Sequence, residues 1–515
     1  MTTRANAGSD VVTPSKRRWW TLSVLVLAVV MLAVDATVLS LAIPSLTATL
    51  EPTAVQMLWI GDVYSFGLAG LLIVMGCVAD RYGRRRTLLI GSVVFGVASV
   101  AAGFAPSAEL LIVFRAMQGV AAATLMPSTL SIIRSVFPDA RERTTAVALW
   151  AAAAAGGAAA GPVVGGFLLE HYWWGSVFVV NAPIVAVLVL GTVLLVPESR
   201  DPDPGAIDPL SVAASLVGIL GLVFAVKQLA SHGPDAVGTL AAMIGLVAGY
   251  AFFRRQRTLA ASPGQAPMID TTLLRIPAFA GSITATFLSV IAFSGLLFFF
   301  AQYLQLVRGY GTLEAGLRIL PLTLSSVLMA PFAGRLARRW GYGRSIGAGL
   351  TAAAIGLVAL AATESSSSFT PLAIALVMVG LGEGLSLALN TDACLSAVPP
   401  NKAGAASGMS ETAYELGVAI GIALLGSALT AVYRSGLPAD APEPIRESLA
   451  SASADTPAAT IETAVDSFVR AMQSVSVLAA AVMAVAAVVA VTVIDRTATE
   501  RRRGDRRAEG RGVRL

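Results

Sequence analysis

The sequence has few charged residues and almost no cysteine or histidine. Charged residues make up 13% of its 515 residues, whereas hydrophobic residues make up 56%. A soluble domain of this length needs more charge to cover its surface, so the composition excludes one. The two cysteines, Cys77 and Cys394, lie in or beside apolar segments and suggest no disulfide framework. The two histidines, His171 and His232, lack partners for a metal site.

Motifs of enzymes and of ATP-driven proteins are also missing. The sequence contains no phosphate-binding loop, no metal-ligand cluster and no nucleophile elbow. We therefore expect neither an enzyme nor a bound cofactor. If the chain moves a solute, an ion gradient must supply the energy.

Long apolar stretches, in contrast, run through the whole chain. A transmembrane helix needs about 20 mostly apolar residues. The stretch that begins at Trp20 is longer than the core of a signal peptide, so it predicts an uncleaved first helix. We expect fourteen helices, at residues 20–43, 54–78, 87–105, 108–132, 144–168, 174–196, 208–230, 236–253, 279–303, 313–334, 345–363, 371–394, 404–430 and 471–494.

Basic residues gather in alternate connections. They lie at 16–18, 81–86, 134–143, 254–257 and 335–344, at Lys402, and in the tail after Arg496. The opposite connections 44–53, 106–109, 169–173 and 364–370 contain no Lys or Arg. Basic loops stay cytoplasmic, so we expect both termini inside the cell and an even number of spans. The net charge of +5 then reflects topology and a lipid-facing tail, and we expect no nucleic-acid partner.

Two loops resemble one another in sequence and indicate an internal repeat. Residues 76–86 join the second and third spans, and residues 334–344 join the tenth and eleventh. The repeat predicts two related six-helix bundles, 20–199 and 276–495, with two additional helices in 200–275. Repeated halves place a substrate path at their interface, near the membrane midplane. Segments 1–19 and 496–515 would be cytoplasmic, and the extracellular loop 431–470 would be disordered or carry a short amphipathic helix.

Several charged residues fall inside the expected spans. A charge in hydrocarbon costs several kcal/mol, from about 2.5 upward, so it faces a polar partner or a wet cavity. Glu411 and Glu415 are one helical turn apart and share a face, with Tyr414 beside them. The acidic candidates are Asp35, Asp62, Glu383, Asp392, Glu411 and Glu415, and the basic candidate is Arg115.

Two further sequence patterns, a glycine-rich run and a loop, have a direct physical interpretation. In the fifth span, small residues four apart allow close helix contact, and a proline removes one backbone hydrogen bond. This run contains Gly157, Gly161, Pro162, Gly165 and Gly166. The first loop of the repeat combines turn-forming glycines with an acid and several arginines. It contains Gly76, Asp80, Arg81, Gly83, Arg84 and Arg85.

Together these residues resemble the motifs of the major facilitator superfamily. Over nearly its whole length the chain is similar to the fourteen-span drug:proton antiporters, which include exporters of quaternary-ammonium antiseptics. The resemblance implies an all-α membrane protein with the major facilitator fold: two six-helix bundles, two extra central helices, and both termini cytoplasmic. It also implies a multi-pass protein of a bacterial cytoplasmic membrane that works as a monomer.

The resemblance also implies roles for the motifs. The loop at 76–85 would latch the cytoplasmic side, although a purely topogenic basic loop is the alternative. Arg115 and Asp35 would handle protons, although a structural salt bridge is the alternative. The run at 157–166 resembles the antiporter signature and points to export, although it could also be only a packing face. Asp62, Glu383, Glu411, Tyr414 and Glu415 would attract or bind a cationic substrate.

Four further runs also resemble the fourteen-span subgroup, at residues 35–44, 59–65, 173–175 and 181–183. Two departures from the motifs of that subgroup limit the expected class of substrate. The antiseptic exporters carry paired acids where this chain has Ser410 before Glu411. Some relatives carry an acid after the Leu-Pro step of the tenth span, whereas residues 321–326 contain none. Fewer acids favour monovalent cations or neutral drugs over divalent cations.

The leading hypothesis is an antiporter that exchanges protons for cationic or amphipathic drugs taken from the cytoplasm or inner leaflet. The first alternative is a dedicated exporter of one antibiotic or secondary metabolite, which confers self-resistance. The second is a membrane sensor or scaffold that keeps the fold without transport. The intact loop, arginine and Gly-Pro motifs argue against the second.

Overall fold

The computed structural model is helical throughout the part of the chain that it describes. That part comprises residues 15–200, 208–232, 235–262, 267, 271–366, 368–398, 403–438, 441–451 and 457–494. The first half contains α1 (Ser15–Leu50), α2 (Ala54–Tyr82), α3 (Arg84–Gly103), α4 (Ala108–Val136), α5 (Ala140–His171), α6 (Ser176–Val179) and α7 (Asn181–Leu195). Next come α8 (Pro209–His232) and α9 (Ala236–Ala261). The second half contains η1 (Leu273–Arg275), α10 (Pro277–Leu306), α11 (Thr312–Trp340), α12 (Tyr342–Thr363), α13 (Thr370–Ser396), α14 (Ala403–Ser435), α15 (Glu443–Glu447), η3 (Leu449–Ser451), α16 (Ala458–Val489) and η4 (Ala490–Ile494).

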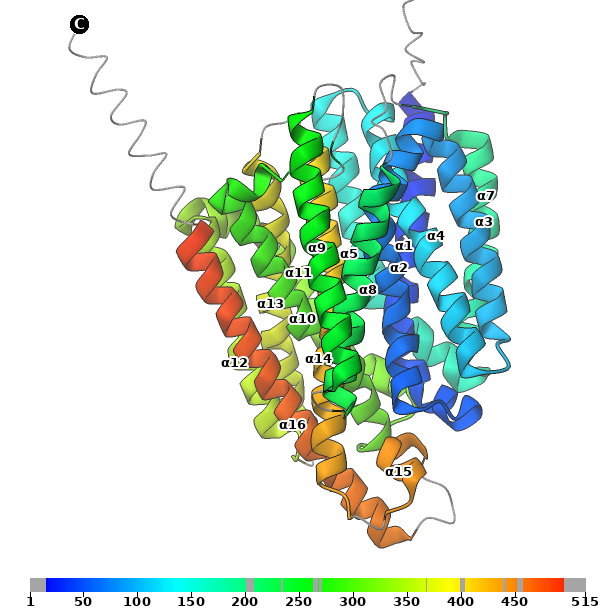
Figure 1. Ribbon diagram of the computed structural model, residues 1–515, viewed down its shortest axis with the longest axis vertical. Coiled ribbons are helices and arrows are strands. Elements are labelled where there is room, and N and C mark those ends of the chain that lie inside the picture. Colours follow the sequence, from blue (N-terminus) through cyan, green and yellow to red (C-terminus); the bar gives the residue numbers. More distant parts are fainter. Residues whose placement is uncertain are drawn as a thin grey trace, which may run out of the picture.

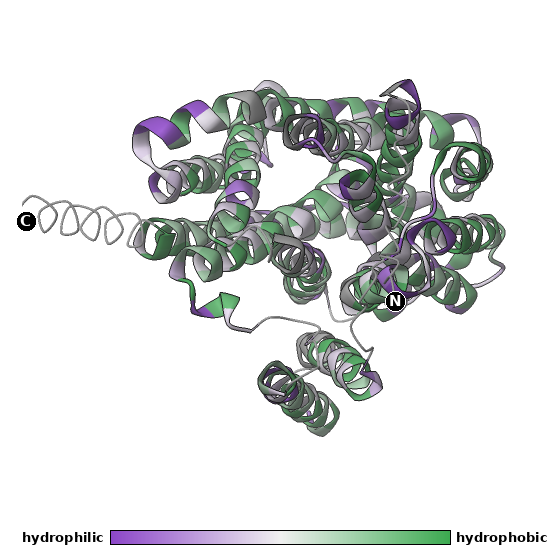
Figure 2. Ribbon diagram, turned by 90° about the horizontal axis from the view of Figure 1, so that it is seen from above, coloured by the Kyte–Doolittle hydropathy of each residue, from purple (hydrophilic) through white to green (hydrophobic). Residues whose placement is uncertain are grey.

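The helices form two bundles and a separate hairpin. Helices α1–α7 make one bundle and α10–α16 the other, and α8 and α9 stand outside both (Figures 1 and 2). Helix α8 packs against α2 and α14, which come from different bundles, and α9 packs on α8. The hairpin therefore covers one of the two seams between the bundles, and the α5–α11 contact forms the other.

An ion pair ties the hairpin together at one end. Asp208 precedes α8 and accepts hydrogen bonds from the guanidinium of Arg255 on α9. The hydrogen bonds from Arg255 hold the pKa of Asp208 well below its usual range. Gln256 reinforces the contact, because its amide donates to the Ser211 hydroxyl at 2.8 Å.

The two bundles repeat one structural detail at their second helix. Gly83 ends α2 and Gly341 ends α11, with φ of 114° and 88°. Each backbone N–H donates four residues back, to Ala79 and to Ala337. Only glycine adopts such φ values readily, so the chain reverses within one residue in both bundles. The internal repeat predicted from the two loops is thus a repeat of structure as well.

The predicted arrangement of two helical bundles with two extra helices is present, but several helix ends differ from expectation. Twelve helices are long and apolar enough to span a membrane over the described residues. Helices α5 and α8 are long enough to span a membrane but are not among those twelve. The count of fourteen spans therefore stays a prediction. The expected connection 431–470 is much shorter, because α14 continues to Ser435 and α16 begins at Ala458. Of the predicted cytoplasmic segments 1–19 and 496–515, residues 15–19 already belong to α1, and the remainder lies outside the described residues.

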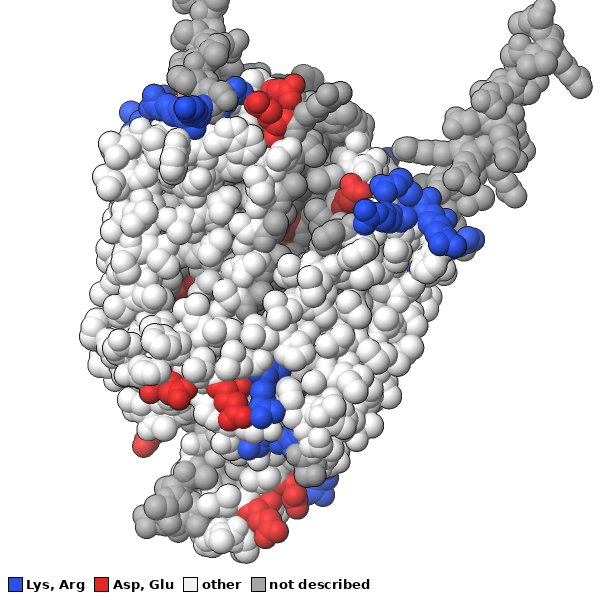
Figure 3. Space-filling model, turned by 180° about the vertical axis from the view of Figure 1, so that it is seen from behind, with Lys and Arg blue, Asp and Glu red and all other residues white. Residues whose placement is uncertain are grey.

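Charged side chains lie mostly at the two ends of the molecule, with a wide uncharged band between them (Figure 3). Helix α1 begins, and α16 finishes, at the same end, which we call the terminal end (Figure 1). The basic residues of the repeat loops lie there, so the sequence rule for basic loops predicts that this end is cytoplasmic.

At the opposite end the bundles are in direct contact. Gln305 of α10 donates to the carbonyl oxygen of Leu41 on α1, at 3.2 Å. Thr312 of α11 donates to the carbonyl of Gly166 on α5, also at 3.2 Å. A Cβ placed on Gly166 would lie 2.6 Å from the Cα of Leu313, so a larger residue there would push the bundles apart. The structure is therefore closed at the opposite end.

Candidate functional site

A buried ion pair lies inside the first bundle. Nη1 of Arg115 on α4 donates to Oδ2 of Asp35 on α1, at 2.9 Å. Both residues are only 1% exposed. Two unlike charges in a medium of low dielectric stabilise each other strongly, and neither is tolerated there alone. The structure thus brings together the two residues that the sequence proposed for proton handling.

Neutral polar side chains complete the surroundings of Asp35. Asn181, the first residue of α7, donates to Oδ1 of Asp35 at 2.8 Å. Gln118 of α4 donates more weakly to the same oxygen, at 3.4 Å. The hydroxyl of Ser99 on α3 accepts from both amides, at 3.0 Å each. The carboxylate therefore receives hydrogen bonds or charge from two other helices, α4 and α7, and a third, α3, orients the amides.

Two aromatic rings pack against the guanidinium of Arg115. Its Cζ lies 4.6 Å from the ring centroid of Tyr64 and 5.7 Å from that of Phe178. A cation over an aromatic face is stabilised by the ring quadrupole. Helices α2 and α4 are pressed together at this level, because a Cβ on Gly119 would overlap the backbone carbonyl of Tyr64. The Tyr64 ring is therefore fixed against the arginine.

A cluster of acids lies in the second bundle. Tyr414 of α14 lies within electrostatic reach of Glu411, Glu415 and Glu383, the last of which comes from α13. Glu383 and Glu415 are buried, whereas Glu411 and Tyr414 are only half-buried. Oε2 of Glu383 has no hydrogen-bond partner among the described residues. The half-buried members are the ones that an incoming solute reaches first.

Helix α2 joins the acid cluster to the first bundle. Ser65 lies beside Glu415, and Phe66 packs with Ala419 of α14 in a small apolar cluster. Asp62 is fully buried and, at helical spacing from Ser65 and Phe66, lies on the same face of α2. Four of the predicted substrate residues therefore gather where α13 and α14 meet, and the fifth, Asp62, lies on the face of α2 that packs against α14.

The repeat loop of the first bundle lies at the terminal end. Asp80 accepts from Arg84 one turn along, at 2.8 Å, which is the predicted acid–arginine contact. Arg81 is exposed, and Gly76 packs beside Pro127 of α4.

Glu198, beyond the end of α7, holds the N-terminus of α3. Its carboxylate accepts from the backbone N–H of Arg85 at 3.2 Å. A Cβ on Gly83 would lie 2.7 Å from the same carboxylate. The sequence did not identify this role of Glu198, because the residue follows the last apolar stretch of the bundle.

The glycines of α5 make close contacts on two sides. Gly157, Gly161 and Gly165 face α1, and a Cβ on Gly161 would overlap the hydroxyl of Thr37. Gly166 faces α11 of the other bundle, and the carbonyl of Pro162 lies where a Cβ of Gly316 would stand. This run is thus a packing face, and it packs both within a bundle and across the α5–α11 seam.

Comparison with known proteins decides the family. Residues 25–422 match the sequence model of the Major Facilitator Superfamily. The chain belongs to the Major Facilitator Superfamily. It is 43% identical to the multidrug efflux pump LfrA of Mycolicibacterium smegmatis, over 89% of this chain and 92% of the relative. It is 35% identical to the methyl viologen resistance protein SmvA of Salmonella typhimurium, over 82% and 84% of the two chains.

The chain is also similar to single-antibiotic resistance proteins and to a transporter of known structure. Two proteins named for resistance to, or export of, a single antibiotic match at 30% and 31% identity. The fold resembles an inward-facing, occupied bacterial homologue of the human lysosomal transporter Spinster, with a TM-score of 0.67 and 16% identity over 93% of this chain and 97% of that one. At that identity the likeness shows the fold alone.

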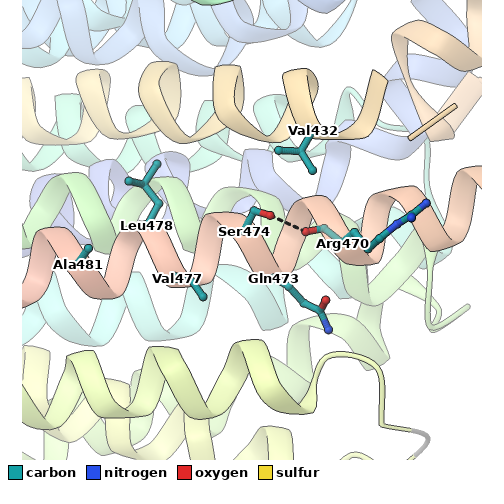
Figure 4. Close-up of a pocket in the computed structure, with 7 residues that line it drawn as sticks. All are labelled: Val432, Arg470, Gln473, Ser474, Val477, Leu478 and Ala481. Atoms are coloured by element: carbon teal, nitrogen blue, oxygen red, sulfur yellow. Dashed lines mark hydrogen bonds between the residues drawn. The ribbon is translucent and has the colours of Figure 1, made fainter. Parts of the chain in front are cut away.

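An open groove on the surface shares no residue with the two charged sites. It has a volume of about 720 Å³ and lies between α14 and α16 (Figure 4). Its lining is mostly apolar, and the side chain of Arg470 extends away from it along α16 (Figure 4). No acid lines it, so it lacks the chemistry that a cation would need.

Another buried acid, which the sequence assigned to a loop, lies at the closed end. Glu364 caps the end of α12 and is 1% exposed. Its carboxylate accepts from the Ser476 hydroxyl of α16 at 2.7 Å, and its backbone carbonyl accepts from the Tyr303 hydroxyl. Burial raises the pKa of Glu364 to about 8.

Proposed function

We propose that this member of the superfamily is a proton-coupled antiporter that exports cationic and amphipathic drugs. It lies in the cytoplasmic membrane of a bacterium with its terminal end inside the cell, works as a monomer and catalyses no chemical reaction. The proton gradient supplies the energy, without a bound cofactor. Two relatives that align with more than 80% of the chain are named a multidrug efflux pump and a methyl viologen resistance protein, which supports the substrate class.

One observation carries the proposal: two buried charged sites, one in each bundle, meet across α2. The first is the Asp35–Arg115 pair. The second is the group of Glu383, Glu411 and Glu415 around Tyr414. A scaffold without transport would gain nothing from such sites, because each buried charge costs stability.

The exchange follows from the needs of a buried carboxylate. A bare negative charge in low dielectric is costly, so the acid cluster requires a positive partner. A proton and a cationic drug each satisfy that need, and they therefore compete. The half-buried Glu411 and Tyr414 would meet the drug first, with the tyrosine ring against its charged face. The displaced proton would leave towards the cytoplasm, and protons from outside would later release the drug.

The path of entry follows from the packing of the two bundles. They touch at the opposite end, so the acids are reached from the terminal end. The α8–α9 hairpin covers the seam between α2 and α14. A drug dissolved in the inner leaflet would therefore enter by the seam between α5 and α11.

Transport into everted membrane vesicles tests this function. The panel comprises ethidium as a monovalent cation, methyl viologen as a divalent cation and chloramphenicol as a neutral antibiotic. We expect gradient-driven uptake of ethidium, its collapse on adding a protonophore, and its loss in Glu411→Gln and Glu415→Gln. Glu462→Gln, an exposed acid early in α16, is the matched control and should transport normally.

Other outcomes would point elsewhere. Uptake that persists without a proton gradient would refute proton coupling. Normal uptake by both variants of the acid cluster would refute its assignment. If a folded protein moves none of the three compounds, dedicated export of one antibiotic becomes the better account, as the single-antibiotic relatives suggest.

A further inference from the structure

Tyr64 lies between the two charged sites. Its ring lies under the guanidinium of Arg115, at 4.6 Å. The same side chain is within electrostatic reach of Asp35 on α1 and of Glu415 on α14. These three are the charged groups that face Tyr64 from the helices packed against it.

The backbone around Tyr64 leaves it little freedom. On one side, Gly119 lets α4 approach until a Cβ there would overlap the Tyr64 carbonyl. On the other side, the next two residues contact α14, because Ser65 lies beside Glu415 and Phe66 packs against Ala419. Tyr64 itself is 4% exposed, so water does not screen the charges on its two sides.

From this geometry we propose that Tyr64 is a positioning residue that couples the Asp35–Arg115 pair to Glu415. The inference rests on the proposed exchange of protons for drug. When a drug cation replaces a proton at Glu415, the local charge distribution next to Tyr64 changes. The ring transmits this change because it excludes water and fixes the distance of Arg115 from α14. Each site thereby alters the proton affinity of the other, across the boundary between the bundles.

Proton release by the purified full-length protein tests the proposal. Ethidium is added to the protein in weakly buffered detergent solution, and the protons released per bound ethidium are measured across a range of pH. Tyr64→Phe keeps the ring and Tyr64→Met fills a similar space without one. Leu72→Met, a buried position two turns further along α2, is the matched control.

We expect Tyr64→Met to shift the pH midpoint of proton release by about one unit, the effect of two unit charges about 10 Å apart at an effective dielectric constant of about 20. Tyr64→Phe should keep the wild-type midpoint, and Leu72→Met should leave it unchanged. Binding of ethidium, which depends on the acids of α13 and α14, should persist in all three variants. If Tyr64→Met fails to fold by gel filtration, Tyr64→Leu takes its place.

The outcomes separate this inference from the proposed function. Absence of proton release from the wild-type protein would contradict the exchange itself. Release by the wild type with the same midpoint in Tyr64→Met would overturn the role of Tyr64 and leave the exchange intact. An equal shift in Leu72→Met would also overturn it, because any disturbance of α2 would then suffice.

Discussion

Removing one member of the Asp35–Arg115 pair should cost more stability than removing both. The two groups are in contact at 2.9 Å, with side-chain exposures of 2% for Arg115 and 0% for Asp35. With charge centres about 4 Å apart and an effective dielectric constant of about 20, their attraction is worth about 4 kcal/mol. Asp35→Asn keeps the shape of the side chain but leaves Arg115 as an uncompensated buried charge. Arg115→Gln likewise leaves Asp35 as an uncompensated buried charge.

We expect each single variant to lose about 3–5 kcal/mol of stability. The double variant Asp35→Asn/Arg115→Gln should lose only about 1–2 kcal/mol, because two neutral amides can bond to each other and to Asn181. Unfolding temperatures of the purified proteins in detergent provide the comparison. Ethidium efflux should be lost in all three, since Asp35→Asn removes the carboxyl that exchanges the proton and Arg115→Gln removes the cation that tunes its proton affinity.

Two results would refute this reasoning. If the double variant is destabilised by the sum of the single losses, the residues do not interact as a pair. If efflux returns in the stable double variant, the pair is only structural, which is the alternative that the sequence left open.

Three further predictions concern residues outside the two charged sites. Gly161→Ala should lower the free energy of unfolding by about 1–3 kcal/mol, because the new methyl group overlaps the Thr37 hydroxyl. Adding Thr37→Ala should recover most of that stability in a thermal melt. If it does not, the contact between α1 and α5 lies elsewhere. Gly83→Ala should lower the unfolding temperature because of its positive φ and its contact with Glu198, and an unchanged temperature would show that the turn can relax. For Glu364, burial raises the pKa from about 4.5 to about 8, so the folded protein loses stability as pH rises between those values. The unfolding temperature of Glu364→Gln should therefore exceed that of the wild type at about pH 8 and equal it at about pH 4. Equal unfolding temperatures at both pH values would contradict the burial of a neutral acid.

The sequence predicted the architecture and the charged pair because both leave strong signals. Long apolar runs and basic loops specify the bundles, and a charge such as Asp35 or Arg115 inside such a run demands a partner. Neutral amides leave a weaker signal. Gln118 and Asn181 cost little in a span, so nothing in the sequence marked them as ligands of Asp35.

The start of the last helix and the burial of Glu364 could not be predicted from the sequence, for one physical reason. Hydropathy set the start of the last helix at 471, because Glu462, Asp466 and Arg470 interrupt the apolar run before it. The structure extends α16 back to Ala458, with Phe468 on its buried face. Glu364 does lie in the predicted connection 364–370, but its burial was not predicted, since the sequence could not show that α16 covers the end of α12. Both features depend on contacts between distant segments.

The most direct test of proton-coupled export uses purified protein in sealed liposomes with no initial proton gradient. Because coupling works in both directions, an imposed ethidium gradient must drive protons the opposite way and so create a proton gradient. We predict proton movement that requires both ethidium and the protein and that disappears in Asp35→Asn. Ethidium movement without any movement of protons would contradict the account.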